Sequence, residues 1–149
     1  MARRSRPRRG RGGKVELLSS VPLFSACTKR ELSRIAALCD KIEVPEGRVL
    51  TREGEAGWEF FVIVDGEAKA SMRGRRGATL GPGSFFGEMS LLDHGTRTAT
   101  VTAETDMELL VLNARDFSGL LLEAPTVSRR ILEVLAQRLR EAERAQPQH

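Results

Sequence analysis

The chain is poor in the residues that build metal centres and disulfide frameworks. Its 149 residues include two cysteines and two histidines. Cys27 and Cys39 are too few and too far apart for a disulfide scaffold or a zinc ribbon, and a reduced, cytoplasmic setting is the simplest interpretation. His94 lies in a polar turn and His149 at the end of the sequence, so together they cannot supply a metalloenzyme's ligands. No nucleophile elbow occurs either, and we expect no enzyme activity.

Long apolar runs are missing as well. No stretch of about 18 apolar residues is present, so we expect no transmembrane segment. The arginine-rich start is not followed by the apolar core of a secretory signal. Basic charge is instead concentrated at one end: residues 1–14 hold seven of the 24 Lys and Arg residues and no acid, which leaves 17 cations against 20 acids in residues 15–149. The larger part of the chain is therefore mildly acidic.

The segment 1–14 is built mainly of arginine, glycine, proline and serine. We expect it to be a disordered basic tail, because it has almost no apolar surface to bury against the entropy cost of ordering. Its cations at 3–14 are compatible with a weak, sequence-independent contact to nucleic acid or to an anionic membrane surface. A solvated leader with no specific role is equally compatible. The expected organisation is this tail at 1–14, one folded domain at 15–143, and a flexible C-terminus at 144–149.

The middle of the sequence has the pattern of short strands joined by tight turns. Ten of the 14 glycines lie between residues 47 and 95, which is typical of a jelly-roll-like barrel. Asp65-Gly66 is the strongest hairpin signal. Period-two and apolar patterns predict strands at 41–44, 49–52, 60–64, 68–72, 78–80, 98–103 and 108–112.

Helical patterns flank these strands on both sides. Thr28 and Glu31 form a capping box that predicts a helix over about 29–39. After the strands, Asn113 is expected to cap a helix that ends near residue 123, and Thr126 to cap a longer one. The fold class is therefore α+β and mainly β, a jelly-roll-like β-roll flanked by N-terminal helices and two C-terminal helices.

The segment 86–101 carries the most informative chemistry. Glu88 supplies a carboxylate that can accept a hydrogen bond from a hydroxyl, and Arg97 a guanidinium that can hold a phosphate through two parallel bonds. Gly87 allows the backbone to come close to a ligand. Arg97 stands at the entrance of a predicted strand, in line with its inward residues, and so needs an anionic partner. That partner is either a ligand or Glu88, in which case the two residues form a simple salt bridge.

Several motifs of the chain resemble those of the cyclic nucleotide-binding domain family, which includes catabolite activator-like and protein kinase A regulatory subunit-like sensors. The main one is Phe86-Gly87-Glu88-Met89-Ser90-Leu91-Leu92 followed by Arg97-Thr98-Ala99-Thr100-Val101, similar to the family's phosphate-binding cassette. Val21-Pro22-Leu23-Phe24, Glu53-Gly54-Glu55-Ala56-Gly57 and Phe61-Val62-Ile63-Val64-Asp65-Gly66 are similar as well. Separate motifs in the family's order make a specific signal that covers roughly residues 15–143.

The resemblance implies a ligand, cyclic AMP or cyclic GMP, and no cofactor or metal. It implies that Glu88 binds the ribose 2′-hydroxyl, that Arg97 pairs with the cyclic phosphate, and that a hydroxyl at position 98 admits guanine beside adenine. It also implies a cradle of backbone N–H groups around the phosphate. The implied binding residues are Gly87, Glu88, Met89, Ser90, Arg97, Thr98 and Ala99.

The resemblance further implies that the last helix moves over the base when nucleotide binds, with Leu132, Leu135 or Arg138 as candidates to cap it. The apolar face of this helix is also compatible with core packing or with a homodimer seam. We expect a non-catalytic sensor that relays nucleotide binding to an unknown effector protein. A transcription regulator is an alternative, although too few residues follow the long helix for a helix-turn-helix, so the basic tail would have to contact DNA. The other alternative is an interaction module that has lost nucleotide binding, which an intact Glu88 and Arg97 oppose.

Overall fold

The computed structural model describes residues 10–145. The strands form two four-stranded antiparallel sheets, with the orders β1-β8-β3-β6 and β2-β7-β4-β5. In chain order the elements are α1 (Gly10–Ser19), the 3-10 turn η1 (Pro22–Phe24), α2 (Lys29–Leu38), β1 (Asp40–Val44), β2 (Val49–Thr51), β3 (Glu59–Asp65), β4 (Ala68–Met72), β5 (Arg75–Leu80), β6 (Phe85–Phe86), α3 (Glu88–Asp93), β7 (Thr100–Ala103), β8 (Met107–Asn113), α4 (Ala114–Glu123) and α5 (Pro125–Ala145).

Strand β3 is buried on both faces, because its sheet separates two apolar cores. Phe60 and Val62 point into a core shared with the helices, whereas Phe61 and Ile63 point into the interior of the β-roll between the sheets. Strand β8 divides in the same way. Side chains alternate across a strand, so a sheet covered on both faces requires an unbroken apolar run rather than an apolar-polar alternation.

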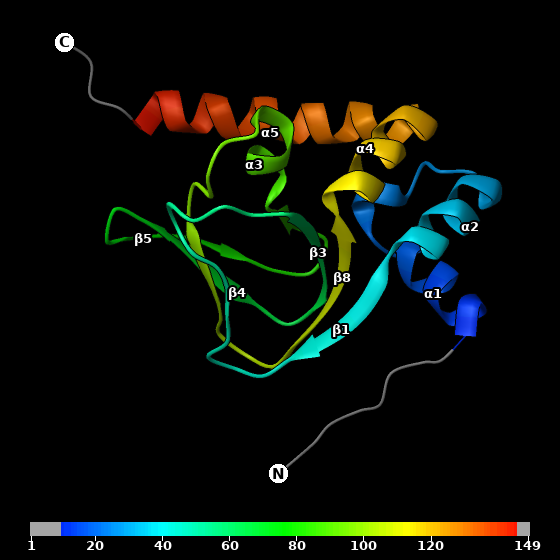
Figure 1. Ribbon diagram of the computed structural model, residues 1–149, viewed down its shortest axis with the longest axis horizontal. Helices are drawn as coiled ribbons and strands as arrows, with labels where there is room; N and C mark the ends of the chain where they lie inside the picture. The colour runs from blue at the N-terminus through cyan, green and yellow to red at the C-terminus, as the bar shows by residue number, and fades with distance from the viewer. Residues whose placement is uncertain (1–9, 146–149) are drawn as a thin grey trace.

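The helices gather around one end and one side of the β-roll (Figure 1). Helices α1, α2 and α4 lie together at one end, where α1 packs against α2 and α4 against α5. Helix α5 extends from this group past the short helix α3 (Figure 1). The long C-terminal helix therefore reaches from the helical core to the segment that carries the sequence motif.

The predicted fold class is confirmed, and each of the seven predicted strands overlaps an observed strand. Strand β6, with only two residues, was not predicted. The hairpin prediction at Asp65-Gly66 is wrong. A turn does occur there, with Gly66 at φ 94°, but the strands it joins belong to different sheets. The true hairpin joins β4 to β5 through Arg73 and Gly74, both with positive φ, which suits the twist of paired strands.

Two of the three predicted helix caps are present. Thr28 accepts from the Glu31 amide at 3.1 Å, and the Glu31 carboxylate accepts from the Thr28 amide at 2.9 Å. Asn113 Oδ1 accepts from the Asp116 amide at 2.8 Å. The third prediction is wrong, since α5 begins at Pro125 and Thr126 lies inside it. Proline suits a first helical position, where its missing N–H leaves no intrahelical bond unmade.

The folded region begins earlier than expected. Helix α1 starts at Gly10 and so overlaps the segment 1–14 that was expected to be a disordered tail; residues 1–9 lie outside the described part. Lys14, assigned to the tail, belongs to the domain: its Nζ donates to the carbonyl oxygens of Ala36 at 2.9 Å and Cys39 at 2.8 Å. At the other end α5 continues to Ala145, past the expected boundary at residue 143.

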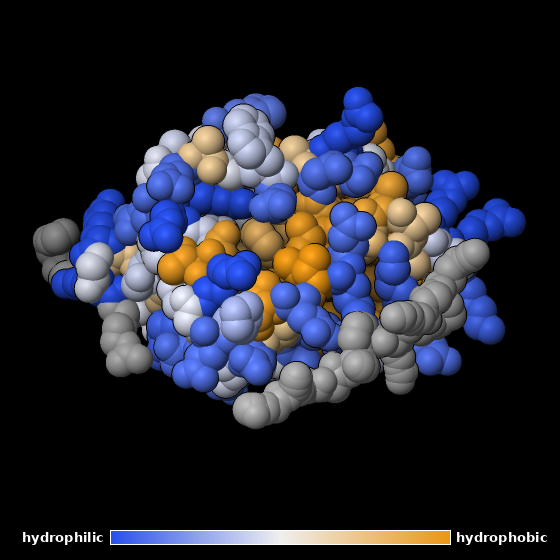
Figure 2. All heavy atoms as spheres, turned by 60° about the horizontal axis from the view of Figure 1, so that its bottom comes forward, coloured by the Kyte–Doolittle hydropathy of each residue, from blue (hydrophilic) through white to orange (hydrophobic). Residues whose placement is uncertain are grey.

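The face shown in Figure 2 has apolar residues gathered near its middle and charged or polar residues around them. The large hydrophobic side chains that are exposed among residues 10–145 are Trp58, Met72, Met89, Leu92, Leu122, Leu132 and Leu139. None of the helices in this range is both long and apolar enough to cross a membrane.

Candidate functional site

The residue directly before helix α3 is a glycine, and any other residue there would be strained. Gly87 follows β6 and has φ 92°, a conformation that favours glycine. A Cβ built there would lie 2.6 Å from the Glu59 carbonyl oxygen and 2.9 Å from Arg97 Nη1. The start of α3 therefore lies directly against strand β3 and Arg97, and the approach of this backbone to a ligand stays a prediction.

Arg97 is buried and held on several sides. It lies just before β7, with 6% of its surface exposed. Its Nη1 donates to the Gly87 carbonyl oxygen at 3.0 Å and to Ser90 Oγ at 3.1 Å. Its side chain also lies against Gly57, where a Cβ would overlap the guanidinium. These contacts fix the guanidinium beside the first turn of α3.

The backbone on either side of this guanidinium is fixed as well. The amide of Arg97 donates to the Glu55 carbonyl at 2.8 Å, and its carbonyl accepts from the Gly54 amide at 2.9 Å. The Glu53–Gly57 motif therefore holds the backbone of Arg97 in place. This explains why the two motifs occur together although they lie far apart in sequence.

The salt bridge between Glu88 and Arg97, left open by the sequence, is not formed. Within residues 10–145 no ion pair joins Arg97 to a carboxylate, and Glu88 pairs with another arginine. Burial lowers the pKa of Arg97, and the nearby charges of Glu59 and Glu88 act in the opposite direction. The guanidinium is thus a buried cation whose Nη1 is bonded to neutral oxygens only.

Glu88 has two carboxylate oxygens in different situations. Its side chain is 4% exposed, and Oε2 lies 3.2 Å from Nη1 of Arg138, a residue of α5. Oε1 is buried and has no hydrogen-bond partner among the described residues 10–145. Burial raises the pKa of Glu88, and the charge of Arg138 is the strongest influence that lowers it. A buried acceptor without a donor is costly, so Oε1 is suited to accept from a ligand.

Arg138 makes two further contacts with the same part of the molecule. Its Nη2 donates to the Phe85 carbonyl oxygen at 2.8 Å, and its Cζ lies 4.7 Å from the centre of the Phe85 ring. The guanidinium therefore joins α5 to β6 and α3 at once. Arg138 was expected as a candidate to cap a base, and its contact with Glu88 was not predicted.

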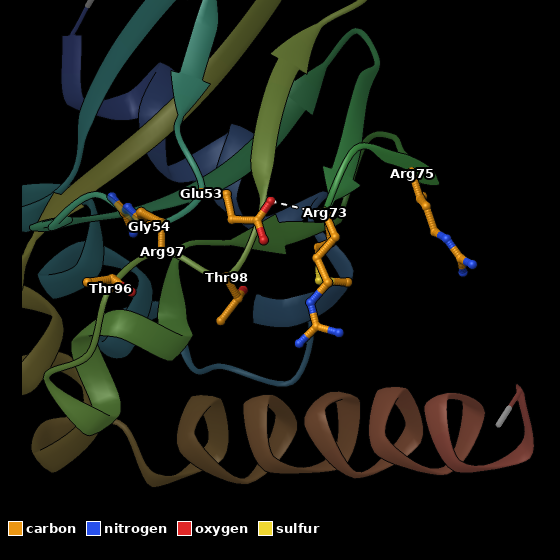
Figure 3. Close-up of a pocket in the computed structure, with 9 residues that line it drawn as sticks. Glu53, Gly54, Arg73, Arg75, Thr96, Arg97 and Thr98 are labelled. Carbon is orange, nitrogen blue, oxygen red and sulfur yellow. Dashed lines mark hydrogen bonds between the residues drawn. The ribbon is translucent and has the colours of Figure 1, made fainter.

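A pocket opens beside Arg97. It has a volume of about 960 Å³ and is lined by Glu53, Gly54, Met72, Arg73, Arg75, Gly77, Thr96, Arg97 and Thr98. Glu53 links two sides of the pocket, since its Oε1 accepts a hydrogen bond from the Arg73 amide at 2.8 Å. The side chains of Arg73 and Thr98 extend toward α5, whereas Arg75 points outward (Figure 3). Arg73 and Arg75 were not predicted, because a charged hairpin tip has no local signal that distinguishes it from ordinary surface.

The structure brings together part of the predicted site. Gly87, Ser90 and Arg97 are in direct contact, and Arg97 and Thr98 line the pocket. Glu88 and Ser90 are buried beside them but are not among the lining residues. Met89 is exposed on α3, and Ala99 is half-buried just before β7.

The candidates for capping a base differ in how exposed their side chains are. Leu132 is 64% exposed, whereas Leu135 is partly buried and packs against the helical core. Among residues 10–145 no three His, Cys, Asp or Glu side chains gather as metal ligands would. The side chains gathered at the site supply a cation, an acceptor and hydroxyl groups, which suit an anionic ligand that carries a hydroxyl.

Comparisons with known proteins point to one family. Residues 41–124 match the family model described as Cyclic nucleotide-binding domain. The chain is 34% identical over 127 residues to the Cyclic AMP receptor protein of Thermus thermophilus, covering 82% of this chain and 59% of that protein. It is 36% identical over 123 residues to a cyclic nucleotide-gated potassium channel of Rhizobium etli, covering 83% of this chain and 34% of the channel.

Solved structures share the fold. The catabolite activator protein of Thermus thermophilus has a TM-score of 0.74 at 35% identity, with 82% of this chain and 60% of that chain covered. The cAMP-bound PfPKA-R has a TM-score of 0.76 at 28% identity, with 89% and 47% covered. The chain thus spans at most 60% of the length of each relative or solved structure named here. By its matched motifs, its family model and its fold, the chain belongs to the cyclic nucleotide-binding domain family.

Proposed function

We propose that the chain is a non-catalytic sensor that binds cyclic AMP or cyclic GMP at the site formed by α3 and the segment before β7. The observation that carries the proposal is the buried guanidinium of Arg97, which has no carboxylate partner among residues 10–145 and lies at the wall of a pocket. A buried cation needs an anion. A cyclic phosphodiester carries one negative charge and oxygens placed to accept two parallel bonds.

Glu88 and the residues around Arg97 supply the remaining contacts. Oε1 of Glu88, buried without a donor, is suited to the ribose 2′-hydroxyl. Gly87, Met89, Ser90 and Ala99 border these two side chains, and backbone N–H groups of this segment complete the phosphate cradle. The similarity to the Thermus thermophilus Cyclic AMP receptor protein and to cAMP-bound PfPKA-R supports the nucleotide as ligand.

Binding is relayed through α5. Its Arg138 contacts Glu88 directly, so an event at the carboxylate reaches the C-terminal helix through one ion pair. Movement of α5 presents a changed surface to an effector protein, and the exposed Leu132 and Leu139 belong to that surface. Leu132, Leu135 and Arg138 stay candidates for contact with the base. Two further partners belong to the proposal: a second copy of the chain, bound through α5, and a nucleic acid that contacts the basic segment 3–14.

Calorimetry with cyclic AMP tests the proposal. Arg97→Ala is expected to weaken binding by about 2–5 kcal/mol, the cost of truncating one partner of a buried charge pair. Arg48→Ala is a suitable control, because Arg48 is exposed and, within residues 10–145, makes hydrogen bonds only through its backbone. Equal affinities of the wild type and Arg97→Ala would refute the assigned site, and a wild type that binds neither nucleotide would favour an interaction module.

Thr98 provides a test of the cyclic GMP proposal. It is exposed and lines the pocket next to Arg97, where its hydroxyl can bond to the guanine amino group. Thr98→Ala is expected to weaken cyclic GMP binding by about 1 kcal/mol, the net value of one hydrogen bond, and to leave cyclic AMP binding unchanged. Parallel titrations with the two nucleotides measure the difference. An equal loss for both would show that Thr98 does not distinguish the bases.

A further inference from the structure

The β4–β5 hairpin forms much of the wall of the pocket beside Arg97. Among residues 10–145, no residue of α5 lines this pocket. The hairpin contributes four of the lining residues, which are Met72, Arg73, Arg75 and Gly77. A ligand held in this pocket therefore contacts the hairpin, and a cover for its base is available there without α5.

The two lining arginines of the hairpin point in different directions. The side chain of Arg73 extends toward α5, whereas that of Arg75 points outward (Figure 3). Both residues are exposed, and within residues 10–145 neither guanidinium makes a hydrogen bond or an ion pair. The guanidinium of Arg73 is therefore available to a ligand in the pocket, and Arg75 carries the same charge in a different direction.

The backbone of Arg73 is fixed to the same segment that holds Arg97. Arg73 has φ 53°, and its amide donates to Glu53 Oε1 at 2.8 Å. The Glu53 amide in turn donates to Thr100 Oγ1 at 3.0 Å. The next amide, that of Gly54, donates to the Arg97 carbonyl oxygen at 2.9 Å. The tip of the hairpin is thereby placed relative to the buried guanidinium, while the Arg73 side chain itself is not held.

A guanidinium suits the face of a purine. It is planar and delocalised, and it stacks on aromatic rings with a contribution from cation–π attraction. Every base has a π face, and a larger ring system makes more contacts with the stacked group. Gly77 adds only backbone to the same wall, so a flat ring can come close to it. The hairpin thus offers a planar cation beside a part of the wall that carries no side chain.

On the basis of the proposed function, we propose that the β4–β5 hairpin covers the base of the bound nucleotide, with the guanidinium of Arg73 stacked on the purine. Helix α5 then relays binding without having to cap the base itself. The stacked guanidinium makes the pocket prefer purine over pyrimidine cyclic nucleotides, because a pyrimidine has one ring in place of two.

Calorimetry with cyclic AMP and cyclic CMP tests the stacking role. Arg73→Asn removes the guanidinium and keeps the turn, because asparagine tolerates positive φ. Cyclic AMP is expected to bind about 10-fold more weakly to this variant, and cyclic CMP about threefold or less. Arg73→Lys keeps the charge without the plane and should also lose most of the purine preference. Arg75→Gln removes the same charge from the same hairpin, and it should weaken both nucleotides equally, by less than about twofold.

The alternative is a cap supplied by α5. Arg138→Gln tests it, with Arg140→Gln, an exposed arginine on the same helix, as the control. A purine preference that survives in Arg73→Asn and is lost in Arg138→Gln would overturn the proposal and assign the cap to α5. Equal losses for the two nucleotides in Arg73→Asn would overturn it too, since Arg73 would then act through its charge alone.

The remaining outcomes separate this proposal from the proposed function. A wild type that binds cyclic AMP and cyclic CMP alike overturns the stacking role while nucleotide binding stands. A wild type that binds neither cyclic AMP nor cyclic GMP overturns the proposed function and the stacking role together. Circular dichroism of each variant confirms that the fold is retained.

Discussion

The two halves of helix α5 are attached to the domain by different kinds of contact. The proximal half, residues 125–134, buries Val127 and Ile131 in the helical core. The distal half, residues 135–145, has a half-buried Leu135, a Leu139 that is 60% exposed, and Arg138 with its polar contacts to Glu88 and Phe85. One half is fixed by packing and the other mainly by one guanidinium.

If α5 relays binding as proposed, this difference allows one helix to be both anchored and responsive. Burial of apolar surface does not depend on the charge of the site, so the proximal half stays docked whatever the site binds. The contacts of Arg138 do depend on the site, because Glu88 is one of their acceptors. A bound ligand can therefore bias the distal half while the proximal half acts as the fixed end.

The largest effect that sharpens the comparison is expected at Ile131. Replacing it with alanine leaves a cavity in the helical core and should lower the free energy of unfolding by about 2–5 kcal/mol. Leu132→Ala removes an exposed side chain from the next position of the same helix. This substitution should change the free energy of unfolding by less than about 0.5 kcal/mol. Urea denaturation of both variants measures the difference. Similar losses for the two would mean that the proximal half is not held by its buried face.

Arg138→Gln should have a smaller and more local effect. The ion pair joins a 38% exposed arginine to a buried carboxylate, so the loss of stability is expected to be about 1 kcal/mol. Amide hydrogen exchange should become faster in residues 135–145 and stay unchanged in 125–134. Arg140→Gln is the matched control. Uniform faster exchange along the whole helix would show that the two halves open as one unit.

Sequence reasoning found the features that depend on local patterns and missed the contacts between distant parts of the chain. The strands, the capping box at Thr28 and the cap at Asn113 depend on local patterns, and these predictions were confirmed. The burial of Arg97 followed from its place in line with inward residues. These features are encoded within a few residues of where they act.

Contacts across long separations were missed. Arg138 meets Glu88 across 50 positions of the sequence, and nothing in the polar face of a helix tells which arginine turns inward. Asp65-Gly66 has the composition of a hairpin, but its strands enter different sheets, and the choice of partner strand is decided by packing rather than by the turn. The sequence motifs predict which residues form the site, and that assignment stays a proposal; only the structure shows how α5 is attached to them.

The smallest expected effect concerns pH. Burial raises the pKa of Glu88 above its ordinary value of 4.5, so the folded chain binds a proton at this group more tightly than the unfolded chain. Stability contributed by this group therefore falls as pH rises from the ordinary value through the raised pKa. Because glutamine does not titrate, the difference in unfolding free energy between the wild type and Glu88→Gln should fall over the same interval and then level off.

Urea denaturation from about pH 4 to pH 8 measures this difference, and Arg138→Gln shows whether the helix takes part in it. Arg138 lowers the pKa that burial raises, so its removal should extend the fall in stability to higher pH. A difference that instead grows with pH would mean that the attraction of Arg138 outweighs burial. The distal half of α5 would then be held by a permanent ion pair, and its contrast with the apolar proximal half would no longer explain a response to ligand.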